Sequence, residues 1–181
     1  MIQEENSRSQ ARFIIGRAFL SPKAHLFFWS IFIATVALDL WTKKAVFDWL
    51  STFPVPMHTV IDGLLYFIKA ENTGAAWSIM QGQRILLSSI SILALIIVLA
   101  FFLFDKNQQR LVQVSLALFA GGITGNLYDR LFNDGKVRDF IDIVYWPGKH
   151  WPAFNVADSV LCIAVRVLII LTLFSHNKLK D

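Results

Sequence analysis

Two aspartates stand where a very apolar chain can least easily hold a charge. Asp139 and Asp158 lie among apolar or small neighbours, beside a long hydrophobic run. An ionisable group at a membrane boundary is costly to desolvate and marks a functional site by default. Two carboxylates held close together cannot both ionise cheaply, so they share one proton and titrate as a pair. The ionised member of such a pair can activate water, and the protonated member can donate to a peptide carbonyl.

Membrane helices are the elements that must bring these two aspartates together. The chain has 181 residues, of which 55% are hydrophobic and only 17% are charged, which is too apolar for an ordinary soluble domain. Runs of apolar residues predict four transmembrane helices, at about residues 26–42, 85–104, 111–128 and 155–174. Asp139 follows the third run and Asp158 opens the fourth. We therefore expect the third and fourth helices to bring the two carboxylates together.

The segment between the first two runs has a different pattern. Prolines at 54 and 56 are followed by short apolar runs bounded by turn residues, which favours short strands over helix. An open sheet cannot lie in hydrocarbon, so a small β-sheet at about residues 56–80 is predicted at the water interface. Residues 1–23 are mainly polar and are predicted to form a short arm. The whole chain, 1–181, is interpreted as one membrane-embedded domain.

Two polar pairs have the spacing that places both members on one helix face. Asp39 and Lys43 are four residues apart with the acid first, the favourable order for an ion pair. This pair either closes the end of the first span or braces a site. Asn126 and Arg130 have the same spacing at the end of the third span, and we favour a role for them in the site.

Other polar residues have a structural and a functional interpretation that both remain open. Asn72-Thr73-Gly74 is either a turn, with Gly74 selected for a positive φ, or a segment that presents Asn72 to a substrate. Asn155 and Asp158 can simply cap the fourth helix. Arg166, inside the fourth span, either snorkels or has an interhelical partner.

Several function classes are excluded by composition. The single cysteine, Cys162, lies inside the last apolar run, so neither a disulfide framework nor a cysteine metal site can form. The four histidines are scattered without ligand spacing, and we expect no metal and no cofactor. A net charge of +4 without a polybasic block argues against nucleic-acid binding. No glycine-flanked nucleophilic serine is present.

Five ordered motifs together resemble those of a known family. They are Asp39 through Lys43, the NTGAA run at 72–76, the glycine-rich run 121–130 ending in Asp129-Arg130, the VRDFID run at 137–142 and the FNVADS run at 154–159. In this order they resemble the motifs of bacterial lipoprotein signal peptidase, signal peptidase II. The resemblance extends from the first span to the fourth.

The resemblance implies a specific fold, location and activity. It implies a four-helix aspartyl endopeptidase of the bacterial inner membrane, with both termini and the 1–23 arm in the cytoplasm and a small extracytoplasmic β-sheet cradle between spans one and two. Such enzymes remove the signal peptide from diacylglyceryl-modified prolipoproteins, cutting on the N-terminal side of the lipidated cysteine. The implied partners are these substrates and membrane lipid, and we expect the chain to act as a monomer with its site near the periplasmic face.

The resemblance also assigns roles to individual residues. The catalytic pair falls on Asp139 and Asp158, and Asp142 becomes secondary, a choice that spacing alone does not make. Substrate-binding or supporting positions fall on Asn72, Gly74, Asn126, Arg130, Asn155, Asp39, Lys43 and Asp129.

Two other function classes remain to be distinguished. In a small proton-coupled transporter, Asp139, Asp158 and Arg130 would form a proton relay. A purely structural membrane subunit would tolerate the loss of either acid. Cleavage of a lipid-modified prolipoprotein separates the peptidase from both.

Overall fold

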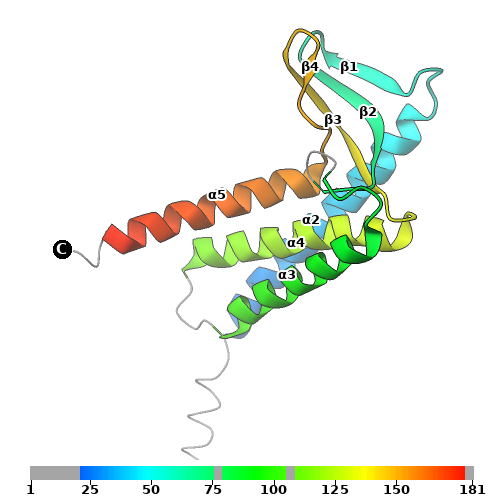
Figure 1. Ribbon diagram of the computed structural model, residues 1–181. Helices are drawn as coiled ribbons and strands as arrows, with labels where there is room; N and C mark the ends of the chain where they lie inside the picture. Colours follow the sequence, from blue (N-terminus) through cyan, green and yellow to red (C-terminus); the bar gives the residue numbers. More distant parts are fainter. Residues whose placement is uncertain (1–20, 76–78, 105–108, 178–181) are drawn as a thin grey trace, which may run out of the picture.

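Four long helices and one small sheet make up the described part of the chain (Figure 1). The structure is a computed structural model that describes residues 21–75, 79–104 and 109–177. The helices are α2 (Pro22–Leu50), α3 (Arg84–Phe104), α4 (Arg110–Phe132) and α5 (Val156–Asn177). Each is long and apolar enough to cross a membrane. The predicted four-helix membrane fold is thus confirmed, while most of the 1–23 arm lies outside the described residues.

Helix α2 continues well past its apolar run. Its start is fixed by Ser21, whose side chain accepts a hydrogen bond from the Ala24 amide at 3.3 Å, and by the proline that follows. Beyond residue 42 the helix keeps one buried face, formed by Lys43, Phe47 and Leu50. These residues recur at helical spacing although charged residues separate them. The helix therefore reaches Leu50, eight residues beyond the end of the apolar run.

Helix α4 is the central helix and packs against the other three. The share of its span that is buried is 61%, against 11–22% for the other three helices. One end of its interface is an apolar core in which Phe28 of α2 stacks on Phe102 of α3 with ring centroids 3.7 Å apart. The other end is polar and carries the candidate site.

Glycines on α4 let its neighbours approach closely. A Cβ at Gly121 would lie 2.7 Å from the side chain of Thr35 on α2. A Cβ at Gly122 would lie 2.8 Å from the carbonyl oxygen of Ala157 and 2.7 Å from the Leu161 side chain on α5. Real Cβ contacts are not this short, so glycine at these positions sets the distance of α2 and α5 from α4.

The sheet combines two segments that are distant in sequence. Strands β1 (Met57–Ile61), β2 (Leu65–Asn72), β3 (Val137–Trp146) and β4 (Lys149–His150) pair antiparallel in that order. Strands β1 and β2 fall in the segment predicted to be a sheet. Strands β3 and β4 lie between α4 and α5, where the sequence analysis predicts no strand. The first half of β3 is buried on both faces. Its sequence therefore does not show the alternation of apolar and polar residues that reveals a half-buried strand.

The pairing of β2 with β3 positions the site. Ala70 lies opposite Asp139, and Asn72 lies opposite Val137 at the inner end of the ladder. Phe154 then makes a bridge to Ile141, with its amide and carbonyl both hydrogen-bonded to that residue. The sheet therefore stands where α2 and α4 end and α5 begins (Figure 1).

Gly122→Ala tests the close packing of α4 on α5. The added methyl group has no room against the Ala157 carbonyl, so we expect the free energy of unfolding to fall by about 1–3 kcal/mol. Thermal unfolding in detergent micelles measures the change. Val165→Ile adds a methyl group at an exposed position of α5 and should have little effect. Equal stability of Gly122→Ala and wild type would contradict the packing argument.

Candidate active site

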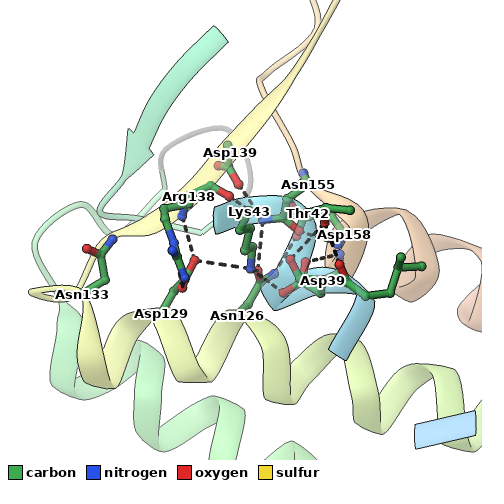
Figure 2. Close-up of polar contacts among 12 residues, drawn as sticks. Asp39, Thr42, Lys43, Asn126, Asp129, Asn133, Arg138, Asp139, Asn155 and Asp158 are labelled. Carbon is green, nitrogen blue, oxygen red and sulfur yellow. Dashed lines mark hydrogen bonds and ion pairs between the residues drawn. The ribbon is translucent and has the colours of Figure 1, made fainter. Parts of the chain in front are cut away.

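Asn155 contacts both aspartates of the predicted pair (Figure 2). Its side-chain Nδ2 donates to Asp139 Oδ1 at 2.6 Å, and its backbone N–H donates to Asp158 Oδ2 at 3.2 Å. Asp139 lies on β3 and Asp158 lies in the first turn of α5. The two carboxylates are therefore held at one place, by a residue that is itself fully buried.

The same contacts cap helix α5. The Asp158 amide donates to Asn155 Oδ1 at 3.0 Å, while the Asn155 amide donates back to the Asp158 carboxylate. This is the reciprocal arrangement of a capping box. The helix-cap interpretation and the functional interpretation of these two residues thus describe the same atoms, and neither excludes the other.

Asn126 on α4 fixes the orientation of Asp158. Its Nδ2 donates to Asp158 Oδ1 at 2.8 Å. Its Oδ1 accepts from Lys43 Nζ at 2.9 Å and from Asn155 Nδ2 at 3.1 Å, which leaves only one possible orientation for the amide. Both oxygens of Asp158 therefore accept hydrogen bonds, as those of an ionised carboxylate do.

Asp139 is the member of the pair whose pKa is raised toward neutral pH. Burial raises its pKa, and the negative charge of Asp158 raises it further, to about 7. Hydrogen bonds from the side chains of Asn72 and Asn155 act in the opposite direction, because they stabilise the charged form. One acid is thus poised to donate a proton while its neighbour accepts hydrogen bonds at both oxygens.

A buried ion group lies beneath the pair. Lys43 Nζ is 2.7 Å from Asp39 Oδ2 and 3.4 Å from Asp129 Oδ2, and all three side chains are fully buried. Asp129 also accepts from Arg138 Nη2 at 2.6 Å. The second oxygen of Asp39 accepts from the Ala157 amide at 2.9 Å. The Asp39–Lys43 pair therefore lies in the interior and connects α2, α4 and α5. It does not close the end of a helix.

Arg130 joins the loop after β2 to the site. Its Nη2 donates to the carbonyl oxygen of Gly74 at 2.9 Å, and its charge acts on both Asp158 and Asp139. The Gly74 amide donates to Asn72 Oδ1 at 2.9 Å, so the side chain of Asn72 closes the turn. The expectation of a positive φ at Gly74 is wrong, since positive φ occurs at other glycines. The turn needs no left-handed residue because the asparagine side chain closes it.

Strand geometry separates Asp142 from the pair. Asp142 is three residues after Asp139 on β3, and side chains an odd number of residues apart point to opposite faces. Its carboxylate contacts His150 Nδ1 of β4 at 2.9 Å. The sequence analysis missed this contact, which depends on the pairing of β3 with β4, and it missed the Asp129–Arg138 pair, which depends on the position of β3.

No group of three or more His, Cys, Asp and Glu side chains within the described ranges is arranged to hold a metal ion.

Comparisons with known proteins agree on one family. The model of the family described as signal peptidase (SPase) II matches residues 31–174. The chain is 34% identical over 159 residues to the lipoprotein signal peptidase of Bacillus pumilus (strain SAFR-032), covering 86% of this chain and 98% of that protein. It is 39% identical over 122 residues to the lipoprotein signal peptidase of Bacillus velezensis (strain FZB42), covering 67% of this chain and 78% of that protein.

Solved structures with the same fold are also found. A bacterial membrane enzyme determined by the in meso method at 2.3 Å resolution superposes with a TM-score of 0.74 and 33% sequence identity, covering 83% of this chain and 90% of that one. A second, determined by the same method at 1.9 Å resolution, gives a TM-score of 0.69 at 34% identity, covering 81% and 92%. The fold of four helices and a small sheet is thus that of a bacterial membrane enzyme.

Lys43→Met tests the ion group beneath the pair. The substitution leaves two buried carboxylates without their shared cation, so we expect the free energy of unfolding to fall by about 3–5 kcal/mol. Unfolding in detergent micelles, followed by circular dichroism, measures the loss.

The neighbouring residue provides a matched control. Lys44 contacts Asp48 at the same 2.7 Å and the same spacing, but its side chain is 73% exposed. Lys44→Met should change stability little, because exposed ion pairs are screened by solvent. If Lys43→Met and Lys44→Met lower the free energy of unfolding equally, then the buried contacts of Lys43 contribute no more than an exposed ion pair.

Proposed function

Because the chain belongs to the lipoprotein signal peptidase family, signal peptidase II, we propose that Asp139 and Asp158 are its catalytic pair. The protein is an aspartic peptidase and a multi-pass bacterial membrane protein that processes prolipoproteins. The observation that carries the proposal is the single buried Asn155 that holds one oxygen of each acid. Family membership also sets aside the transporter and structural-subunit alternatives.

The reaction we propose uses the two acids in opposite protonation states. Asp158 takes a proton from water as the water oxygen attacks the scissile carbonyl carbon, and Asp139 gives its proton to the carbonyl oxygen. The tetrahedral diol then collapses. Asp158 returns its proton to the leaving nitrogen as the C–N bond breaks, and Asp139 recovers a proton from the hydroxyl that becomes the new carbonyl. The pair ends as it began.

The remaining polar residues support this reaction. Asn126 and Asn155 orient the two acids. We propose that Asn72, Gly74 and Arg130 line the substrate position. Asn72 ends β2 beside Asp139, and Arg130 of α4 donates a hydrogen bond to the Gly74 carbonyl in the loop that follows. Asp39, Lys43 and Asp129 hold the helices that carry the site.

The position of the pair at the helix ends is compatible with a lipid-anchored substrate. We propose that the enzyme cuts diacylglyceryl-modified prolipoproteins on the N-terminal side of the lipidated cysteine. The acyl chains can stay in the bilayer while the peptide bond reaches the pair at the helix ends, which orients the bond and reduces the search. We also propose a single domain over 1–181 that acts as a monomer. We further propose that the site faces the periplasm and that the termini and the 1–23 arm lie in the cytoplasm.

Asp139→Asn and Asp158→Asn test the assignment of the pair. Each substitution keeps the size of the side chain and removes one proton-transfer group, so we expect the cleavage rate to fall by at least about 10²-fold. The assay follows the mass of a purified diacylglyceryl-modified prolipoprotein as its signal peptide is released. Circular dichroism shows whether each variant keeps its fold.

Asp142→Asn is the matched control on the same strand. Asp142 points to the other face of β3 and contacts His150, so its loss should leave cleavage close to the wild-type rate. Normal cleavage by the 139 and 158 variants, or loss of cleavage only in the 142 variant, would overturn the assignment. Equal cleavage of an unmodified prolipoprotein would overturn the proposed lipid dependence.

The pKa of Asp139 predicts a pH dependence. Below about 7 the residue holds the proton that the reaction needs, and above about 7 it ionises. We therefore expect kcat/KM to fall as pH rises, with one proton lost at a midpoint of about 7. Asn72→Ala removes a hydrogen bond that favours the charged form, so the midpoint should move to higher pH. A flat profile, or an unmoved midpoint in Asn72→Ala, would contradict the protonation states proposed above.

A further inference from the structure

Arg166 is a charged residue on the outward face of α5. The helix packs on the molecule through Ala157 and Ala164, which are fully buried, with Leu161 and Leu168 beside the core. Arg166 comes two residues after Ala164 and so lies on the other side of the helix, where its side chain is exposed. Its helical neighbours one turn away, Cys162 and Ile170, are exposed as well.

Arg166 lies too deep in the span for its guanidinium group to reach water at either membrane boundary. The part of α5 that can cross a membrane is Val156–Phe174. At 1.5 Å per residue, Arg166 lies about 15 Å from the first of these residues and about 12 Å from the last. Helical side chains tilt toward the N-terminus, so this one leans toward the more distant boundary. Snorkelling works for cationic residues near helix ends, and Arg166 is not near one.

The described part of the chain supplies no counter-charge at this depth. No ion pair or hydrogen bond of the Arg166 side chain is present among the described residues. Asp39 and Asp129 are buried inside the molecule, and the exposed Asp48 lies near the end of α2. A second copy of the chain packed against this face would therefore bring no exposed acid from these spans to Arg166.

We propose that the outward face of α5, defined by Cys162, Arg166 and Ile170, binds a transmembrane helix of another protein that carries an acidic residue at mid-membrane depth. Charges inside a bilayer are usually paired with one another, and guanidinium and carboxylate match in two parallel hydrogen bonds. A lipid phosphate is the less favourable partner, because it lies at the boundary that the side chain does not reach. This interaction is separate from peptidase activity, since Arg166 follows Asp158 by two helical turns.

Cys162 allows a direct test, because it lies one turn before Arg166 on the same face and is the only cysteine in the chain. The probe is a synthetic leucine–alanine transmembrane peptide with one central aspartate and one cysteine four residues away. Two versions, with the cysteine before or after the aspartate, cover both orientations. The full chain and the peptide are placed in phosphatidylcholine vesicles with a mild oxidant, and the disulfide adduct is quantified by mass spectrometry.

We expect the aspartate peptide to give about fivefold more adduct than a matched peptide with leucine at its centre. Arg166→Leu should remove this difference. The double variant Arg166→Leu/Leu173→Arg moves the positive charge to a position near the end of the span. It should give equal adduct with the aspartate and leucine peptides. Prolipoprotein cleavage by Arg166→Leu should match the wild type.

Four results would overturn the proposal. Equal adduct with both peptides would show that the aspartate is not recognised, and a preference that persists in Arg166→Leu would show that the arginine is not the partner. Adduct that disappears in phosphatidylglycerol vesicles, with lipid retained on the protein through Arg166, would identify a lipid phosphate as the occupant. Loss of cleavage in a folded Arg166→Leu variant would assign the residue to the peptidase instead.

Discussion

A single buried ammonium group links the elements that carry the proposed catalytic pair. Lys43 Nζ contacts Asp39, Asp129 and Asn126, none of which could be buried alone without a large desolvation penalty. Two of these residues then reach α5, and the third reaches β3. Asp39 holds the first turn of α5, Asp129 holds the start of β3 through Arg138, and Asn126 orients Asp158. The positions of both acids are thus tied to one charge on α2.

This arrangement explains why the most buried helix is also polar. Helix α4 must supply Asn126, Asp129 and Arg130 to the site at one end while it packs against three helices along its length. Gly125 lies one turn from Asp129, and its lack of a side chain leaves room for the Asp39 carboxylate. Small residues therefore do two things on this helix. They allow close packing, and they leave room for the Asp39 carboxylate.

The sequence predicts those features that depend on periodicity and length. Four apolar runs predict four helices because crossing hydrocarbon sets a minimum length, and the fold confirms them. The length of α2 was underestimated, because the predicted span ends where the apolar run ends, at residue 42. The helix continues beyond it with a buried face that contains Lys43. Strand β3 was missed for a related reason: its buried positions include Asp139 and Asp142, which look like loop residues in a sequence.

The choice between Asp139 and Asp142 shows where single-sequence reasoning ends. Spacing alone treats both acids alike, and only the motif resemblance favoured the first. Once β3 is known to be a strand, its alternation sends one acid toward Asn155 and the other toward His150. The contacts from Lys43 to Asp129 and from Asp129 to Arg138 could not be predicted either, because they join residues from three elements whose relative placement depends on the fold.

The capping box at the start of α5 couples the start of the helix to the geometry of the proposed catalytic pair. Asn155 caps the helix through its backbone N–H and its Oδ1, and the Nδ2 of the same side chain donates to Asp139. Fraying of this one turn would break the contacts of Asn155 with both acids at once. Under the proposed mechanism, loss of this one helical turn would therefore stop peptide cleavage.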